Sequence, residues 1–512
     1  MKRLILILLV ALALTANLSA VVAQGNDTIT LEPFTDGRYG LSGVTPKGWK
    51  TASPGVVQRG RDATDVTLLA QQAAPLQMEG LLNAVYPQFG LKEAPKSTGT
   101  HQGKALEWTL YRFEGTFQNA PVSFMMGLAS KDGKTYIVLL QTTADEIDAL
   151  TESVFTPVID ALAPVVEKPT EVAPYREEEV TFSNGDVTLA GTLSLPPSDG
   201  PHPAVVLVTG SGPQDRNEDI GFQLKPFKVI ADYLTRQGIA VLRYDDRGVG
   251  KSTGDFAAAT SMDLASDAAA ALAYLQTRKD ITPTEIGMLG HSEGGMIAAI
   301  LGSQQQKFAF YVSLAGTAVD GAAILLKQNE LIMRANGGTD EQIKTQIDYL
   351  TKAFDLMKKG DEKALETLTY EAIKEQVAAL PEAQRSQIGD VEKYAKEQAA
   401  AQAKALMTPW YRYFISYDVG AAWEKTTTPV LAIFGGKDLQ VSADQNAPAF
   451  EAEMKKAGNK DYKVVIFPKA NHLMQEATTG SPNEYATLKQ EFLPDVMPTI
   501  ADWIKARVTI AK

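Results

Sequence analysis

The stretch Gly290-His291-Ser292-Glu293-Gly294 has the form G-x-S-x-G, a motif that can present a serine as a nucleophile. Apolar residues at 286–289 predict a short strand before it, and residues 296–301 predict a helix after it. On such a strand-to-helix turn the hydroxyl projects above the sheet, and the two glycines remove side chains that would collide. Because so loose a motif also recurs by chance, it needs partners elsewhere in the chain.

A serine hydroxyl is almost wholly protonated at neutral pH, so a nucleophilic serine needs a general base, usually a histidine. The chain has only 4 histidines. His101 falls in a different predicted domain, His202 precedes a predicted strand, and His291 adjoins the serine with its side chain expected to point elsewhere. His472, in a loop just past the last predicted strand, is therefore the expected base.

An acid should orient that imidazole and stabilise its charged form. Asp438 follows directly after the preceding predicted strand, residues 430–434, and is the best candidate, with Asp444 as a local alternative. The resulting chain order of Ser292, Asp438 and His472 is the order that accompanies this kind of turn. We expect these three residues to act together as a catalytic triad.

Attack on a carbonyl also creates an oxyanion that needs positioned hydrogen-bond donors. The backbone amide after the nucleophile, that of Glu293, is the first expected donor. The second should come from an earlier loop at a strand end, and residues 208–212, Val-Thr-Gly-Ser-Gly, end the first long apolar strand. The sequence thus predicts an oxyanion hole formed by the amides of Ser211 and Glu293, although a mere tight turn at 209–212 is the alternative.

Composition and charge exclude several classes of partner and cofactor. A formal net charge of -12 with no long basic run argues against nucleic acid as a partner. The absence of cysteine excludes disulfides and thiolate chemistry. Gly250-Lys251-Ser252 is similar to the end of a phosphate-binding loop, but that motif requires glycine where Asp245 stands. We therefore expect no cofactor and no metal.

The first 23 residues carry Lys2 and Arg3, then an apolar run, then small residues at 21–23. This pattern predicts a secretory signal peptide cleaved after Ala23, and hence an exported protein, periplasmic or extracellular, with no stable membrane insertion after cleavage. An uncleaved membrane anchor is the alternative. Because no cysteine follows the cleavage point, a lipid-anchored lipoprotein is excluded.

At 512 residues the chain is too long for one ordinary domain. Residues 28–163 alternate strand-like segments with turn signals and predict a small α+β domain whose role the sequence does not reveal. Residues 164–177 are rich in proline and charge and predict a linker. From 178 to 512 we expect a second domain that contains the serine.

In that second domain a hairpin signal at Asn184-Gly185 is followed by apolar strands that alternate with helices, which predicts a mostly parallel sheet with helices on both faces. Residues 485–506 should form the closing helix. About a hundred residues of helical character, 316–417, interrupt the alternation where a cap over the site would be placed. Aromatic residues cluster at 410–414 in this insertion and either line a pocket or dock the cap.

Residues from about 178 to 510 resemble bacterial α/β-hydrolases of the serine esterase and peptidase kind. The resemblance lies in residues 210–218 (GSGPQDRNE), 245–252 (DDRGVGKS), 290–295 (GHSEGG), 436–438 (GKD) and 471–472 (NH). It implies an α/β-hydrolase fold with a helical cap, preceded here by the small α+β domain. It also implies a cofactor-free serine hydrolase that forms an acyl-enzyme, but it does not specify the substrate.

We expect a small-molecule ester as the substrate. A serine peptidase, of the aminopeptidase or prolyl-peptidase type, is the alternative with the same chemistry, because Asp215, Glu218 and Asp219 could bind a substrate's amino terminus, although hydrogen bonding within their own loop is the simpler role. An inert binding protein of the cell envelope is a third hypothesis, which the Ser292, Asp438 and His472 trio argues against. Acyl preference and oligomeric state do not follow from the sequence.

Overall fold

The computed structural model describes residues 29–511, except 37–38, 54, 62–64, 75–76, 90, 118–119, 132–133, 166–172, 220–223, 381, 383–384, 386–387 and 389. The predicted signal peptide at 1–23 and the middle of the predicted linker lie outside the described residues. Contacts divide the chain into two compact units, residues 1–170 with 221–223, and residues 171–220 with 224–512.

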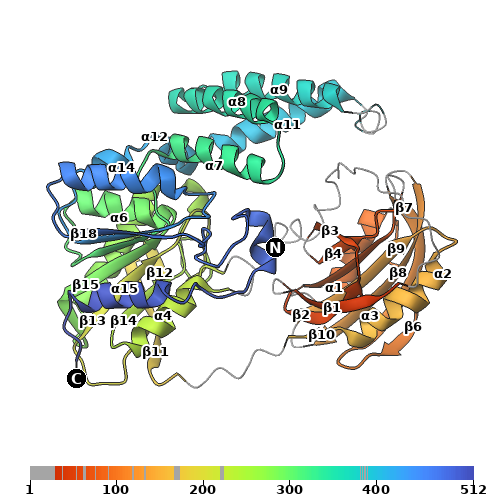
Figure 1. Ribbon diagram of the computed structural model, residues 1–512, viewed down its shortest axis with the longest axis horizontal. Coiled ribbons are helices and arrows are strands. Elements are labelled where there is room, and N and C mark those ends of the chain that lie inside the picture. Colours follow the sequence, from red (N-terminus) through yellow and green to blue (C-terminus); the bar gives the residue numbers. More distant parts are fainter. Residues whose placement is uncertain are drawn as a thin grey trace. The chain divides into compact units, whose positions relative to one another are not determined.

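The N-terminal unit contains two antiparallel sheets. The larger has the order β3-β4-β5-β9-β8-β7-β6 and the smaller the order β1-β2-β10 (Figure 1). The strands are β1 (Leu31–Asp36), β2 (Leu41–Pro46), β3 (Lys50–Ser53), β4 (Val56–Gln58), β5 (Leu68–Ala74), β6 (Ser97–Gln102), β7 (Glu107–Phe117), β8 (Ala120–Lys131), β9 (Lys134–Thr142) and β10 (Ala163–Pro164).

Both faces of the larger sheet are covered by apolar cores. Successive side chains of a strand point to opposite faces, and alternate residues of β9 lie in different cores. Val138 and Leu140 pack in one core with the helical segment formed by α2 (Ile147–Leu150), η4 (Thr151–Phe155) and α3 (Thr156–Ala161). Ile137 and Leu139 face the other core, with α1 (Met78–Val85) and η3 (Tyr86–Phe89). This unit therefore has a complete hydrophobic interior of its own.

The C-terminal unit is built on an eight-stranded sheet of order β11-β12-β14-β13-β15-β16-β17-β18. Strands β11 and β12 form the opening antiparallel hairpin, β12 pairs with β14 antiparallel, and every later pairing is parallel. The strands are β11 (Arg176–Asn184), β12 (Val187–Leu195), β13 (His202–Val208), β14 (Ala240–Tyr244), β15 (Ile281–His291), β16 (Tyr311–Leu314), β17 (Val430–Gly435) and β18 (Tyr462–Phe467).

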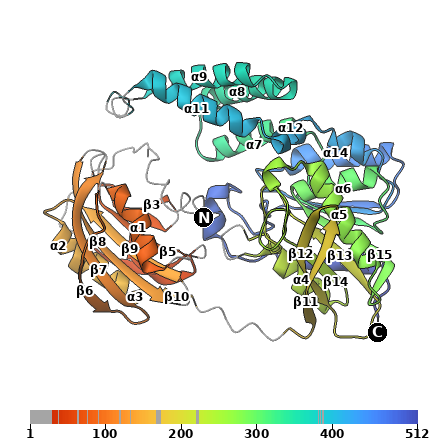
Figure 2. The same cartoon turned by 180° about the vertical axis from the view of Figure 1, so that it is seen from behind.

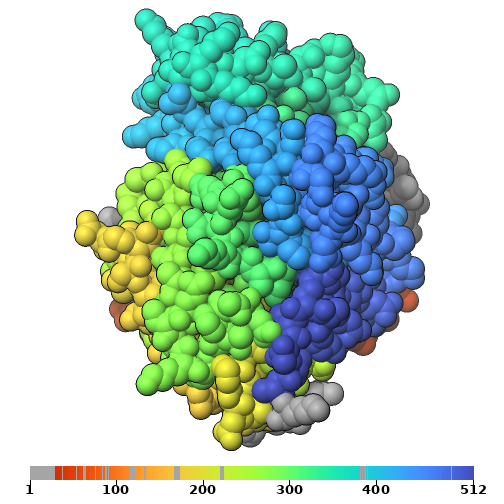
Figure 3. Space-filling model, turned by 90° about the vertical axis from the view of Figure 1, so that its left-hand side faces the viewer, coloured from red at the N-terminus to blue at the C-terminus, as the bar shows by residue number. Residues whose placement is uncertain are grey.

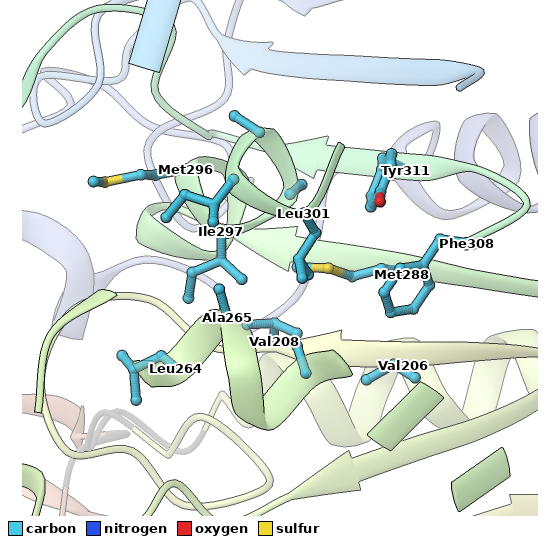
Figure 4. Packing of buried hydrophobic residues seen from close by; sticks show 14 of the residues in the cluster. Val206, Val208, Leu264, Ala265, Met288, Met296, Ile297, Leu301, Phe308 and Tyr311 are labelled. Atoms are coloured by element: carbon cyan, nitrogen blue, oxygen red, sulfur yellow. The ribbon is translucent and has the colours of Figure 1, made fainter. Parts of the chain in front are cut away.

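Helices cover both faces of this sheet, as predicted (Figure 1). Val205 and Leu207 of β13 pack in the core that contains α4 (Pro226–Arg236) and α15 (Val496–Lys505). Residues 204, 206 and 208 of the same strand face the other core, with α5 (Ser261–Gln276), α6 (Glu293–Ser303) and α14 (Ala443–Lys456). Figure 4 shows part of this second core, in which apolar side chains of α6 pack against the sheet.

The helical insertion lies between β16 and β17 and follows the predicted position. Its helices are α7 (Gly321–Ala335), α8 (Asp340–Lys359), α9 (Glu362–Ala379), α11 (Val391–Leu406), α12 (Pro409–Ser416) and α13 (Val419–Trp423). Helices α8, α9 and α11 form an outer layer, and α7 and α12 lie between that layer and the helices on the sheet (Figures 1 and 2). The space-filling view shows the insertion packed continuously onto the rest of the unit (Figure 3).

The predicted closing helix at 485–506 is wrong in its first half. Tyr485 lies in a short 3-10 helix, η6 (Pro482–Thr487), and α15 begins only at Val496. Pro494 explains the difference, because proline lacks the amide that a continuous helix needs and disfavours helical backbone in the residue before it.

The loop that follows β13 is fastened to the end of β14 by a buried ion pair. The guanidinium of Arg216 donates to both carboxylate oxygens of Asp245, at 3.0 and 2.8 Å. The backbone amides of Arg216 and Lys251 also donate to this carboxylate. Burial alone would raise the pKa of Asp245, but these donors bring it below its usual value. The pair thus fixes residues 210–216 in relation to the sheet.

We expect Arg216→Met to lower the free energy of unfolding of the C-terminal unit by about 3 kcal/mol, because it leaves a buried carboxylate without its charged partner. The stabilisation should be present at neutral pH and lost as the pH falls below about 4, since Asp245 titrates below its unfolded value in the native state. Urea denaturation of both proteins at pH 7 and at acid pH measures the difference.

Arg176→Met is the matched control, because Arg176 pairs with Glu178 and Asp280 while 63% of its side chain is exposed. Its effect should stay within about 0.5 kcal/mol. Equal effects of the two substitutions at pH 7 would contradict the role given to the buried pair.

Candidate active site

Ser292 lies between β15 and α6 in a backbone conformation that non-glycine residues rarely adopt, with φ 53° and ψ -114°. Its amide donates to the carbonyl of Leu314 at 2.9 Å, and its carbonyl accepts from the amide of Gly295. Although Ser292 occupies the N-cap position of α6, its side chain makes no capping hydrogen bond. The hydroxyl is therefore available for chemistry.

The glycines of the motif are required by the tightness of the turn. A Cβ atom on Gly290 would lie 2.1 Å from the carbonyl oxygen of Gly294. A Cβ atom on Gly294 would lie 2.3 Å from the carbonyl oxygen of Val208. Both distances are far below van der Waals contact, so neither position accepts a side chain.

His472 and Asp438 meet in a hydrogen bond of 2.8 Å between Nδ1 and Oδ2. Both side chains are buried, and the other oxygen of Asp438 accepts from the amides of Gln440 and Val441 at 2.8 and 2.9 Å. Asp438 is thus held as an oriented acceptor. Asp444, the local alternative, is exposed in the first turn of α14.

The loop that carries His472 packs against the turn that carries Ser292. The neighbour of the serine, His291, hydrogen-bonds through Nε2 to the backbone carbonyl of His472 at 3.1 Å. The two imidazole rings lie 4.9 Å apart between centroids. The remaining histidines are elsewhere: His101 pairs with Asp160 in the N-terminal unit, and His202 is buried at the start of β13.

The two residues predicted to supply oxyanion donors lie near the serine. Gly210 approaches so closely that a Cβ atom on it would be 3.2 Å from the Cβ of Ser292, which places the adjoining Ser211 at the turn. Glu293 is the first residue of α6, where helix amides have no partner within the helix. Neither the Ser211 amide nor the Glu293 amide has an acceptor among the described residues.

The side chain of Glu293 connects the turn to the cap, a role that the sequence did not indicate. Its carboxylate is buried and accepts from the hydroxyl of Ser261 at 2.6 Å and from the indole Nε1 of Trp410 at 2.9 and 3.0 Å. Burial raises the pKa of Glu293 above its usual value, although Ser261, Trp410 and Ser211 donate to it and oppose the shift. Trp410 belongs to α12, so this contact favours the docking interpretation of the aromatic cluster.

Two more buried carboxyl groups lie near the turn. Asp246 accepts from the amide of Gln214 and the hydroxyl of Thr209, and burial, with the nearby charges of Glu293 and Glu218, raises its pKa to about 8. Glu218 is paired with His291 at 2.8 Å and accepts from the amide of Gly210.

The other carboxylates considered as an amine-binding group have partners in their own loop. Asp215 accepts from the amides of Asn217 and Asp219, both at 3.0 Å. Asp219 lies 3.6 Å from the ammonium group of Lys225.

The site therefore offers three kinds of group. Ser292 is strained and makes no capping hydrogen bond, and His472 is oriented by Asp438. The amides of Ser211 and Glu293 have no hydrogen-bond acceptor among the described residues. This set of groups suits nucleophilic attack on a carbonyl carbon.

The sequence named Glu218 only as a possible amine-binding group and left Trp410 between pocket lining and cap docking. Their contacts with His291 and Glu293 were not predicted, because they join segments far apart in the chain.

The chain is similar to known hydrolases. A family model described as serine aminopeptidase, S33, matches residues 223–477. Esterase EstD of Thermotoga maritima is 28% identical over 341 residues, covering 65% of this chain and 70% of EstD. Among solved structures, an esterase of Pyrococcus furiosus shares 14% identity at a TM-score of 0.41, covering 67% of this chain and 97% of its own.

Est1E of Butyrivibrio proteoclasticus, solved with ferulic acid, shares 16% identity at a TM-score of 0.36, covering 64% of this chain and 98% of its own. The opening hairpin, the parallel sheet between two helical layers and the Ser292 turn agree with the matched family and with the sequence similarity to EstD. The chain has an α/β-hydrolase fold and is a hydrolase, similar over residues 223–477 to the serine aminopeptidase family.

Proposed function

We propose that this hydrolase cleaves carboxylic esters through an acyl-enzyme, with Ser292 as nucleophile, His472 as general base and Asp438 as the group that orients His472. The observation that carries the proposal is the 2.8 Å bond between His472 and Asp438 in a loop that packs against the strained Ser292 turn. Nδ1 of His472 is engaged by Asp438, which leaves Nε2 as the ring nitrogen that can serve as the base.

In the acylation half-reaction, the Ser292 hydroxyl oxygen attacks the ester carbonyl carbon while Nε2 of His472 takes its proton. The negative charge that develops on the carbonyl oxygen is met by the amides of Ser211 and Glu293. The tetrahedral intermediate collapses when the bond to the alcohol oxygen breaks, and His472 returns the proton to that oxygen. The acyl group remains bonded to Ser292.

Deacylation repeats the same steps with water. His472 removes a proton from the water molecule as it attacks the acyl carbon, and the same two amides stabilise the new oxyanion. When the bond to Ser292 breaks, the proton returns to the serine oxygen and the carboxylic acid leaves. Asp438 keeps its hydrogen bond to Nδ1 of His472 and stabilises the imidazolium in both halves.

Esters are favoured over peptides because the carboxylates in the loop after β13 already have hydrogen-bond partners. An aminopeptidase needs a free anionic group for the substrate's amino terminus, but Asp215 and Glu218 already accept hydrogen bonds within the protein. EstD is also named as an esterase. Peptide cleavage is the second candidate, because the matched family model is described as a serine aminopeptidase.

We also propose that the protein is exported, on the strength of the apolar run and small residues at 1–23. Among the described residues no helix has the length and apolar character needed to cross a bilayer. Cell fractionation with N-terminal sequencing should find a mature chain beginning at Gln24 in the periplasm or medium. An intact chain beginning at Met1 in the membrane fraction would contradict export with cleavage.

For the chemistry itself, we expect the protein to hydrolyse p-nitrophenyl esters much faster than aminoacyl or prolyl anilides. Ser292→Ala and His472→Ala should each lower kcat by about four to six orders of magnitude, because members of a triad act as a unit. Initial rates over one panel of esters of rising chain length and anilides measure both effects.

Ser303→Ala, at the other end of α6, is the control serine and should retain full activity. Retained turnover in both Ser292→Ala and His472→Ala would refute the triad. Faster anilide than ester cleavage would make the protein a peptidase, and an inactive wild type that does not react with a fluorophosphonate would favour the inert binding protein.

We expect Trp410→Phe to loosen the cap while leaving the serine chemistry intact. The substitution keeps an aromatic ring beside Phe414, which stacks on Trp410 at 5.3 Å, but removes the donor to Glu293. Loss of that bond should cost about 1–3 kcal/mol of stability and raise KM for the longer esters several-fold more than it lowers kcat. Thermal denaturation and steady-state kinetics measure these effects.

Trp423→Phe is the matched control, because it removes an indole hydrogen bond to the neutral carbonyl of Thr317 instead. It should lower stability without changing the chain-length dependence of KM. The same change in KM in both variants would mean that Trp410 has no special role in docking the cap.

A further inference from the structure

His291 makes a contact with each of its ring nitrogens, and the two contacts reach different parts of the site. Nε2 lies 3.1 Å from the backbone carbonyl oxygen of His472, and Nδ1 lies 2.8 Å from Oε1 of Glu218. The side chain is 8% exposed and that of Glu218 is 3% exposed. The pair therefore lies buried beneath the Ser292 turn.

The chemistry of the partners fixes the proton on Nε2. A backbone carbonyl oxygen can only accept, so Nε2 of His291 must donate to His472. The contact between Nδ1 and Glu218 then shares one further proton, and Oε1 of Glu218 also accepts from the amide of Gly210 at 2.8 Å. With one proton on Nε2 and one shared between Nδ1 and Oε1, the pair carries no net charge.

The environment agrees with this description. Burial alone would lower the pKa of His291, but the charge and hydrogen bond of Glu218 raise it above its usual value. Glu218 itself has a positive φ of 53°, the same as Ser292. Its Oε2 is buried without a hydrogen-bond partner among the described residues. A strained residue with an unsatisfied buried oxygen costs stability, which is typical of functional positions.

Resting on the function proposed above, we propose that Glu218 and His291 are positioning residues that join three segments of the active site. Through Gly210 they hold the loop of the oxyanion donor, through His291 they hold the nucleophile turn, and through the carbonyl of His472 they hold the loop of the base. The arrangement repeats the Asp438–His472 pair, with Glu218 orienting His291.

The consequence for catalysis is geometric. His472 must keep Nε2 within hydrogen-bond reach of the serine, and the carbonyl of His472 is the point where its own backbone is anchored to the turn. Because the pair is neutral as a whole, it anchors this backbone without placing an uncompensated charge beside the base. A displacement of about 1 Å at the base costs up to about 10²-fold in rate.

Two substitutions of His291 separate its two contacts. In His291→Asn the amide nitrogen takes the place of Nδ1, so the contact with Glu218 is kept and the bond to the His472 carbonyl is lost. In His291→Gln the amide nitrogen takes the place of Nε2, so the bond to the carbonyl is kept. We expect His291→Asn to lower kcat for a p-nitrophenyl ester about 10- to 100-fold with KM nearly unchanged, and His291→Gln to recover most of that loss.

The experiment compares kcat, KM and melting temperature for the wild type, both His291 variants, His472→Ala and His202→Asn. His202 is buried at the start of β13 away from the turn, so His202→Asn controls for the loss of a buried imidazole and should lower the melting temperature without lowering kcat. If His291→Asn does not fold, Glu218→Gln takes its place, because a neutral amide supplies no negative charge to pair with Nδ1 of His291. It should lower kcat by a similar factor.

Full activity of His291→Asn beside an inactive His472→Ala would overturn the inference and leave the triad standing. Equal losses of kcat in the Asn and Gln variants, or loss of folding in both His291→Asn and Glu218→Gln, would show a purely structural pair and overturn it as well. A wild type inactive on every ester would refute the proposed function and this inference together.

Discussion

The backbone strain at Ser292 is the constraint on which the rest of the C-terminal unit depends. A positive φ at a non-glycine residue costs about 1–3 kcal/mol, and such a conformation persists only where the surroundings enforce it. The enforcement comes from β15 and α6, whose apolar side chains pack largely in one buried core (Figure 4), with Leu289 of β15 in the core on the other face of the sheet. Glycine at 290 and 294 lets the backbone close to distances that no side chain permits.

Around that turn the protein also buries a set of polar groups. Asp438, Glu218, Glu293 and Asp246 are each less than a tenth exposed, and each has donors from a different segment. In a low-dielectric interior such groups are costly unless they are paired, so their partners become fixed in position. The carboxylates thereby connect the loop after β13, the turn, the cap and the His472 loop into one arrangement.

Much of this architecture could be predicted from the sequence because it depends on local patterns. The alternation of apolar strands with helices indicated the parallel sheet, and the 4 histidines left His472 as the candidate base by elimination. Contacts between distant segments could not be predicted: Trp410 is 117 residues from Glu293, and His291 is 73 residues from Glu218 and 181 from His472. The start of α15 differs from the prediction because Pro494 prevents one continuous helix over residues 485–506.

The most direct test of the central claim is a crystal structure of the mature protein after reaction with an alkyl fluorophosphonate. The account predicts phosphorus bonded to Oγ of Ser292, and the phosphoryl oxygen about 2.7–3.1 Å from the amides of Ser211 and Glu293. His472 should lie beside the adduct with Asp438 behind it. An adduct on another residue, or a phosphoryl oxygen directed away from both amides, would contradict the account.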